Sequence, residues 1–171
     1  MKVTSAHYVT ASVEETVWLG EQLGTCLRHG DVVALVGDLG GGKTWFTKGV
    51  ALGLGIDPDT IVSPTFTIVN EYDGTHKLFH IDLYRLKDKT EIEALDLDEY
   101  LSAKGVVVVE WADRWPREFP RETVVVALRM VDDHTRELRF SASHGRAREI
   151  LRALKQKIGL PLPRGHLNAQ N

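Results

Sequence analysis

Residues 37–44 read GDLGGGKT, a glycine-rich run that ends in a Lys-Thr pair. The run matches the pattern G-x-x-x-x-G-K-[ST] of phosphate-binding loops at every fixed position. An apolar segment at 32–36 precedes it, and a segment of helical character from Trp45 to Leu54 follows it. This order of strand, loop and helix places a helix N-terminus beneath a phosphate group. The sequence therefore predicts a nucleoside triphosphate site, and a glycine-rich turn that binds nothing is the alternative.

Each position of the loop has its own physical role. The glycines allow backbone angles that other residues avoid, so successive N–H groups turn towards phosphate oxygens. Lys43 brings an ammonium group to the β- and γ-phosphates, and Thr44 offers a hydroxyl to Mg²⁺. The residues that we expect to contact the nucleotide here are Asp38, Leu39, Gly40, Gly41, Gly42, Lys43 and Thr44.

Length and composition suit one domain, because the chain has 171 residues, 43% of them hydrophobic and 26% charged. We expect this domain to cover residues 1–159 and a loose tail to cover 160–171. The net charge of −3 gives no global electrostatic case for binding nucleic acid or a membrane. Cys26 alone cannot form an internal disulfide, and we find no signal-peptide pattern or membrane-spanning apolar stretch. These features predict a cytoplasmic protein.

Periodicity and turn residues predict alternating helices and strands around the loop. Ser12 and Glu15 form a capping box for a helix over about 13–26. Capping pairs also predict two short helices, with Thr90 and Glu93 starting one and Asp96 and Glu99 the other. A last helix covers about 146–158. The predicted strands are 32–36, 65–72, 77–84, 106–109, 123–128 and 136–141, with turn residues at 73–76 joining the second and third into a hairpin.

This pattern predicts an α/β chain with the three-layer fold of P-loop NTPases. Its central sheet is expected to be mixed and mainly parallel, with β-hairpins and with helices on both sides. In such sheets a ligand binds at the carboxyl ends of the strands, which is where the phosphate loop also lies.

Two carboxylates stand at the ends of predicted strands. Glu110 follows four valines at 106–109 and fits the acidic element that holds Mg²⁺ or orients the attacking water. A solvated strand end is its alternative. Asp82 lies among apolar residues, and a buried carboxylate is costly unless it is paired or binds a metal. An ordinary ion pair with Arg85 is the alternative for Asp82.

Other features point to function less specifically. The segment 63–67 carries three hydroxyl side chains at a position where nucleotide-dependent proteins often have a segment that orders on the γ-phosphate. Trp45 and Trp111 could stack on a ligand, although each is more often a core residue. The last helix is locally basic, which fits a solvated face or a surface that meets RNA or an acidic partner.

Four segments in this order resemble the TsaE (YjeE) family: GDLGGGKT at 37–44, SPTF at 63–66, HIDLYR at 80–85 and VVVVEW at 106–111. The resemblance runs from about Val13 to the last helix. It implies a small P-loop ATPase of tRNA threonylcarbamoyladenosine biosynthesis, weak alone and stimulated by its partners TsaD and TsaB. Contact with tRNA through that complex is possible, and the modified adenosine lies beside the anticodon.

The resemblance also assigns roles to single residues. It implies that Lys43 and Thr44 bind phosphate and Mg²⁺, that Glu110 is the acid of the Mg²⁺ site, and that Asp82 is the essential acid of the HIDLYR segment. Thr65 matches the switch-like segment. We therefore expect Lys43, Asp82 and Glu110 to be catalytic, with Thr44 and Glu110 as metal ligands.

Adenine contacts in the family come from the N-terminal helix region and from a late arginine, and Val13 and Arg136 are the nearest candidates. Trp111 matches the aromatic residue after the acid. The segment 112–120 matches nothing that we can assign.

Three function classes remain open at this level. An ATPase that powers partner proteins is the first, and in-line attack of water on the γ-phosphate would be its chemistry. A small-molecule kinase is the second, but no lid-like cluster of arginines follows the loop. A nucleotide-gated binding module with incidental hydrolysis is the third. A GTPase is disfavoured, because the chain has no N-K-x-D motif for guanine.

Overall fold

The computed structural model describes residues 3–159 and 168–169. In chain order its strands are β1 (Thr4–Thr10), β2 (Val32–Val36), β3 (Val69–Tyr72), β4 (Leu78–Asp82), β5 (Val106–Glu110), β6 (Thr123–Met130), β7 (Arg136–Ala142) and β8 (Asn168–Ala169). The α-helices are α1 (Val13–Gly24), α2 (Lys43–Gly53), α3 (Lys89–Ala94), α4 (Leu97–Ser102) and α5 (Gly145–Gly159). Three 3₁₀ turns complete the set: η1 (Pro58–Thr60), η2 (Ala112–Arg114) and η3 (Pro116–Glu118).

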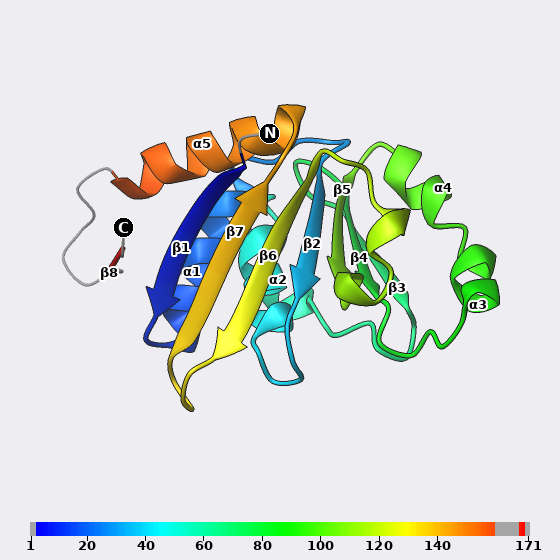
Figure 1. Cartoon of the computed structure of the whole chain (residues 1–171), viewed down its shortest axis with the longest axis horizontal. Helices are drawn as coiled ribbons and strands as arrows, with labels where there is room; N and C mark the ends of the chain where they lie inside the picture. The colour runs from blue at the N-terminus through cyan, green and yellow to red at the C-terminus, as the bar shows by residue number, and fades with distance from the viewer. Residues whose placement is uncertain (1–2, 160–167, 170–171) are drawn as a thin grey trace.

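The strands form one eight-stranded sheet in the order β3-β4-β5-β2-β6-β7-β1-β8 (Figure 1). Its centre is parallel, since β4 pairs with β5, β5 with β2, and β2 with β6 in that orientation. The strands on either side of this centre pair in antiparallel orientation. On one side β3 pairs with β4, and on the other β7 pairs with β6, β1 with β7, and β8 with β1. The predicted mixed sheet is thus confirmed, but it is not mainly parallel: three of its seven strand pairings are parallel, and they are confined to the strands around the phosphate loop.

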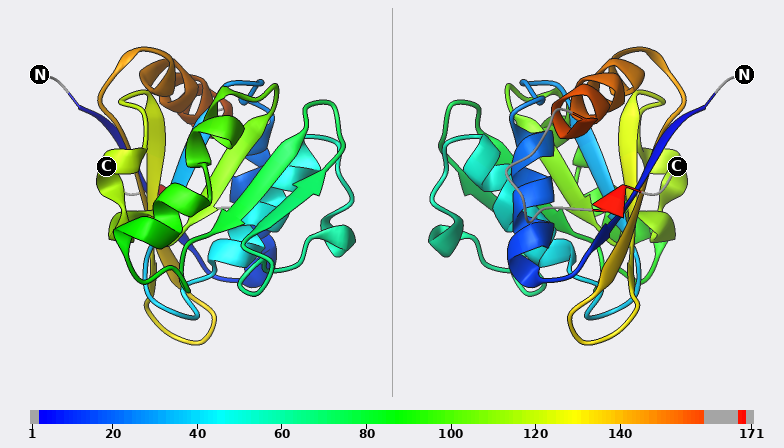
Figure 2. Two further views of the ribbon diagram at one scale, coloured as in Figure 1. Left: turned by 90° about the vertical axis from the view of Figure 1, so that its right-hand side faces the viewer. Right: turned by 90° about the vertical axis from the view of Figure 1, so that its left-hand side faces the viewer.

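Helices cover both faces of the sheet and give the predicted three layers (Figure 2). On one face α1, α2 and α5 pack on side chains such as Val33 and Leu35. On the other face α3, α4 and the turns at 112–118 pack on Val32 and Ala34. Alternate residues of β2 therefore enter opposite cores, as expected for a strand buried on both sides. None of the described helices lies in front of β1, β7 and β6 in Figure 1.

The helices α1 and α2 approach each other through glycines. A Cβ atom added at Gly49 would lie 2.0 Å from the carbonyl oxygen of Val17, and one at Gly20 would lie 2.3 Å from that of Phe46. Such distances are far below van der Waals contact, so only glycine permits this packing. The close pair holds α2, and with it the phosphate loop, against the sheet.

Several local predictions differ from the structure. The strand predicted over 65–72 begins only at Val69, because residues 65–68 form a turn in which the Ile68 N–H donates to the Pro64 carbonyl. Strand β1 was not predicted, and it lies at the antiparallel side of the sheet paired with β7. A strand of polar and mixed residues carries little local signal, and its pairing partner β7 lies more than a hundred residues away in sequence.

Of the two predicted caps of the short helices, Asp96 stands at its predicted position before α4, whereas Thr90 does not cap α3. Helix α3 begins two residues earlier than expected, and its cap is Asp88, whose carboxylate accepts from the Glu91 N–H. Asp96 precedes α4 in a left-handed conformation with φ of 50° and caps through no side-chain hydrogen bond. The long helices α1 and α5 match their predicted ranges to within about two residues. Of the predicted tail, residues 160–167 and 170–171 lie outside the described residues, and β8 pairs with β1.

Candidate functional site

A cavity of about 260 Å³ lies where β2, β4 and β5 end. The phosphate loop follows β2, and the two acids singled out from the sequence are the last residues of β4 and β5. The carboxyl ends of parallel strands share one edge of a sheet. Gly40, Asp82 and Glu110 therefore meet there, although 28 to 70 residues separate them in the sequence. The residues that line the cavity are Leu39, Gly40, Gly41, Gly42, Lys43, Thr44, Trp45, Ser63, Thr65, Asp82, Glu110, Trp111 and Arg136.

Two of the three consecutive glycines have the backbone conformation predicted for the loop, and Gly41 does not. Gly40 and Gly42 have φ values of 77° and 98°, in the left-handed region that favours glycine. Gly42 then caps α2, which begins at Lys43, so the first free N–H groups of that helix border the cavity. Free N–H groups and the positive end of the helix dipole favour an anion at this position.

Lys43 is folded back onto the loop. Its Nζ donates to the carbonyl oxygens of Gly37 and Asp38 at 2.7 and 2.8 Å, and it lies 4.0 Å from the centre of the Trp111 ring. The side chain is almost fully buried, and this burial lowers the pKa of its ammonium group although Glu110 and Asp82 act in the opposite direction. Trp111 has a φ of 60°, a strained value for a non-glycine residue, and this turns its ring onto the lysine.

Glu110 is held by two donors at the end of β5. The Thr44 hydroxyl donates to its Oε1 atom at 3.1 Å, and His80 Nε2 lies 2.7 Å from the same oxygen. A carboxylate only accepts hydrogen bonds, so the proton of this contact belongs to His80 Nε2. Glu110 and His80 are 3% and 0% exposed, which excludes the solvated strand end considered from the sequence.

Asp82 has a separate set of partners. Its Oδ2 accepts from the Thr65 hydroxyl and its Oδ1 from the Tyr84 N–H, each at 2.8 Å. Burial raises the pKa of this carboxyl against the lowering effect of these two hydrogen bonds. Among the described residues Asp82 forms no ion pair with Arg85, whose guanidinium lies instead over the Phe66 ring. The ion-pair alternative for Asp82 is therefore not what the structure contains.

The donor set fits Mg²⁺ bound together with a nucleotide. Within residues 3–159 and 168–169 no group of three or more His, Cys, Asp or Glu side chains could hold a metal by itself. Mg²⁺ in phosphate sites, however, is bound through one or two protein oxygens together with phosphate oxygens and water. The Thr44 hydroxyl and the Glu110 carboxylate, which touch each other beside the loop, offer such a pair.

The two residues predicted near adenine differ in position. Arg136 lines the cavity, and its side chain lies close to Gly42, with Nε 3.6 Å from a Cβ placed there. Val13, at the start of α1, does not line the cavity. Asp38, also predicted to contact the nucleotide, does not line the cavity, and its carbonyl accepts from Lys43.

His80, which contacts Glu110, is one residue near this site to which the sequence interpretation assigned no role. A signal for it existed, because His80 and Asp82 are two residues apart on one strand and so point to the same face of the sheet. Trp45 and Ser63 also line the cavity, and 46% of Trp45 is exposed, so Trp45 is not a core residue. The unassigned segment 112–120 forms η2 and η3 and packs Trp115 and Phe119 on the second core.

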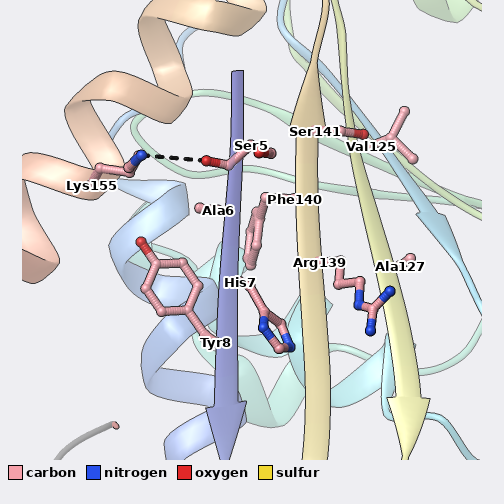
Figure 3. Close-up of a pocket in the computed structure, with 10 residues that line it drawn as sticks. All are labelled: Ser5, Ala6, His7, Tyr8, Val125, Ala127, Arg139, Phe140, Ser141 and Lys155. Atoms are coloured by element: carbon pink, nitrogen blue, oxygen red, sulfur yellow. Dashed lines mark hydrogen bonds between the residues drawn. The ribbon is translucent and has the colours of Figure 1, made fainter. Parts of the chain in front are cut away.

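A second hollow, of about 630 Å³, lies at β1, β7 and β6 on the sheet (Figure 3). His7 and Arg139 point from neighbouring strands there, and Lys155 of α5 donates to the Ser5 carbonyl. This hollow has no glycine loop or helix N-terminus, and none of the predicted site residues lines it. The cavity at the phosphate loop is therefore the candidate site for the predicted nucleotide. In the described part of the chain, every helix is too short or too polar to cross a membrane.

The strand–loop–helix unit at the carboxyl edge of this mixed sheet defines a protein of the P-loop class. Comparison with known proteins narrows the class. The family model described as "Threonylcarbamoyl adenosine biosynthesis protein TsaE" matches residues 10–138. The chain belongs to the TsaE family.

Individual relatives agree with this assignment. The tRNA threonylcarbamoyladenosine biosynthesis protein TsaE of Bacillus subtilis is 45% identical over 134 residues, covering 78% of this chain and 83% of the relative. The protein of the same name from Treponema pallidum is 42% identical over 130 residues, covering 76% and 96%. The crystal structure of Bacillus subtilis YdiB matches with a TM-score of 0.79 and 36% identity, over 92% of this chain and 99% of that one.

Proposed function

We propose that this chain binds and hydrolyses Mg·ATP to support formation of threonylcarbamoyladenosine in tRNA, in complex with TsaD and TsaB in the cytoplasm. The main structural support for ATP hydrolysis is that Asp82 and Glu110 are register neighbours on β4 and β5, beside Lys43 and Thr44. The names of the matched relatives support the tRNA modification part. The TsaD and TsaB partners rest on the resemblance of the four sequence segments to the family.

Different residues of the site would have different roles in phosphoryl transfer. The N–H groups of residues 40–44 and the Lys43 ammonium would bind the β- and γ-phosphates, which requires Lys43 to leave the carbonyls of Gly37 and Asp38. Thr44 and Glu110 would hold Mg²⁺, and the bound ion would neutralise charge that develops on the phosphate oxygens. Asp82 is the remaining acid and would orient the attacking water.

The arginine content of the cavity lining leads us to expect slow turnover of the isolated chain. Arg136 is the one arginine among the lining residues of the described structure, and its Nη1 donates to the carbonyls of Asp132 and Thr135. It lies beside Gly42 at the loop rather than beside the acids. An arginine that stabilises the transition state is worth roughly 10³–10⁵ in turnover, so a site without one is expected to be slow until a partner completes it.

The decisive experiment measures ATP hydrolysis by this chain alone and with its cognate TsaD–TsaB pair. We expect weak activity alone, stimulation by the pair, and loss of both in a Glu110→Gln variant. Brisk hydrolysis without the pair would contradict a partner-dependent ATPase. Transfer of phosphate to a nucleoside or other metabolite in the same assay would point to the kinase alternative instead.

One observation also favours a nucleotide-gated binding module. Thr65 lines the cavity and binds Asp82, while the next residue, Phe66, is 83% exposed. A ligand that moves Thr65 would therefore also move an exposed aromatic side chain. If an Asp82→Ala variant loses hydrolysis and still supports modification of tRNA by the TsaD–TsaB pair, the gated binding module is the better description.

A further inference from the structure

Part of the sheet has no covering layer on one of its faces. None of the described helices lies in front of β1, β7 and β6 (Figure 1). Tyr8, Leu138 and Val126 of these strands belong to the first core, so the residues that alternate with them point to the uncovered side. We call this side the open face, and its residues include Ser5 and His7 of β1, Arg139 and Ser141 of β7, and Ala127 and Arg129 of β6. The function proposed above leaves it unused.

Two arginines occupy the middle of the open face. Arg129 and Arg139 both donate to the Glu137 carboxylate, at 2.7 and 3.0 Å, so one acid holds two guanidinium groups in place. Their side chains are nevertheless 67% and 69% exposed. Two guanidinium groups carry many more N–H donors than one carboxylate can accept. The pair is therefore held in position with most of its donors left for a ligand.

Helix α5 adds cations at the border of the open face. Lys155 lines the same hollow as the open-face residues of β1 and β7, and its Nζ donates to the Ser5 carbonyl (Figure 3). Arg148 lies on the same flank of the helix, where its Nε contacts the Thr4 hydroxyl at 3.4 Å. Arg152 is exposed and stands between the two at helical spacing. These three side chains form a basic stripe that continues onto the open face.

The open face and the stripe together carry an excess of positive charge. Five cations stand against one carboxylate: Arg129, Arg139, Arg148, Arg152 and Lys155 against Glu137. The whole chain, by contrast, has a net charge of −3, and its segment 88–99 on the side of α3 and α4 holds six Asp and Glu residues. The cations are thus gathered on one side of an acidic protein, which is the electrostatic pattern of a surface that binds nucleic acid.

The open face lacks the apolar anchors of a protein interface. The side chains named for it are serine, histidine, alanine and arginine, whereas protein partners are usually held by large aromatic or aliphatic side chains seated in pockets. Contacts to phosphate need only N–H and O–H donors, which arginine, lysine and serine supply. The composition of this surface therefore favours a nucleic-acid backbone over an acidic protein segment.

We propose that the open face and the basic stripe of α5 bind the phosphate backbone of tRNA directly. This inference rests on the proposed function for the identity of the RNA. Contacts to phosphate fix position and carry no sequence information, so this surface would hold the tRNA without selecting it. The hollow on the open face shares no lining residue with the nucleotide cavity, so RNA and nucleotide do not compete for any of these side chains.

The experiment measures binding of an unmodified tRNA transcript to the full chain by fluorescence anisotropy over a range of salt concentrations. Because phosphate contacts release counterions, affinity for the wild type should fall steeply with salt. A double variant with Arg139→Gln and Lys155→Ala should raise the Kd by at least about tenfold at physiological salt. It should also lower the slope of log affinity against log salt by about two, one for each lost phosphate contact.

Lys157→Ala is the matched control. Lys157 lies on the same helix as Lys155, but its Nζ donates to the Thr25 hydroxyl at the end of α1, away from the open face. This variant should bind tRNA as the wild type does. Thermal unfolding and ATP hydrolysis with the TsaD–TsaB pair, measured on every variant, check that the fold and the nucleotide site are intact.

Each outcome supports or overturns a defined statement. If the wild type binds tRNA and the double variant binds equally well, the open face is not the RNA surface, while the proposed function stands. If the wild type binds no tRNA although the pair stimulates its ATP hydrolysis, direct RNA binding is overturned and the proposed function again stands. If tRNA binds as expected but the pair gives no stimulation, the proposed function fails and the RNA surface remains. Loss of binding to the pair with unchanged tRNA binding would make the open face a protein surface and overturn the RNA assignment.

Discussion

Asp82 and Glu110 are register partners at the ends of the parallel strands β4 and β5, and only 2% and 3% of their surfaces are exposed. Burial, and to a lesser extent the Glu110 charge, raises the pKa of the Asp82 carboxyl, and a buried carboxylate needs hydrogen-bond donors. Asp82 takes Thr65 and a backbone N–H, whereas Glu110 takes Thr44 and His80. Because the donors differ, the two acids can perform different tasks at one edge of the sheet.

Replacing Asp82 by Asn should separate binding from turnover. The asparagine side chain keeps the shape of the aspartate and can still accept a hydrogen bond from Thr65. It lacks the negative charge that orients water, so hydrolysis with the TsaD–TsaB pair should fall roughly 10²–10⁴-fold. The Kd for ATP should change little. Turnover is measured under saturating ATP and the Kd by equilibrium binding. A variant that keeps normal turnover would remove Asp82 from the catalytic residues.

Lys43→Ala should weaken ATP binding by roughly 2–5 kcal/mol, the usual loss when one member of a buried charge pair is truncated. Lys48→Ala is the matched control, since Lys48 lies on the same helix and its Nζ contacts the Pro58 carbonyl outside the cavity. Equilibrium binding of ATP to both variants gives the comparison. An unchanged affinity in Lys43→Ala would rule out the site assignment.

His80→Phe should destabilise the fold by about 1–3 kcal/mol, because it leaves the buried Glu110 carboxylate without one of its donors. It should also raise the Mg²⁺ concentration needed for ATP binding, since Glu110 loses a contact that orients it. His80→Gln can restore an N–H donor and should recover part of both effects. Urea unfolding and Mg²⁺ titrations measure them. Identical behaviour of the Phe and Gln variants would argue that His80 only fills space.

Gly49→Ala should lower stability by about 1–3 kcal/mol, even though alanine is the better helix former, because its Cβ would meet the Val17 carbonyl. For a chain of this length the loss corresponds to a fall in Tm of about 2–4 °C per kcal/mol. Gly159→Ala is the control, since no atom in the described part of the chain lies within 4 Å of a Cβ at that position. A thermal melt of Gly49→Ala at or above the wild-type Tm would contradict the close approach of α1 and α2.

Glu137 should contribute stability that depends on pH. Hydrogen bonds from Arg139 and Arg129 lower the pKa of its carboxyl from the ordinary 4.5 to about 2. A lowered folded-state pKa stabilises the protein above the unfolded value and loses that effect as the pH falls through the folded one. Glu137→Gln should therefore destabilise the fold at pH 7, and the difference should shrink between pH 4.5 and about 2. Urea unfolding of the wild type and Glu137→Gln across this pH range measures the difference in the free energy of unfolding. Glu118→Gln, at an exposed position, is the control.

The sequence by itself determined the parts of the protein that depend on neighbouring residues. The phosphate loop needs glycines, a lysine and a threonine at fixed spacing, and Gly40 and Gly42 have left-handed angles in the structure. The hairpin turn at 73–76 and the helices α1, α2 and α5 likewise follow from turn residues, caps and periodicity. These features are encoded within short windows, where local backbone preference decides the outcome.

The tertiary structure alone decided which distant residues meet. The pairing of Asp82 with Glu110, the contact of His80 with Glu110 and the place of β1 beside β7 are set by strand order and register. Register depends on burial and pairing across the whole sheet, so no local window contains it. The loop could therefore be predicted to bind phosphate from eight residues, whereas the set of acids and donors that completes its site exists only once β4, β5 and β2 lie side by side.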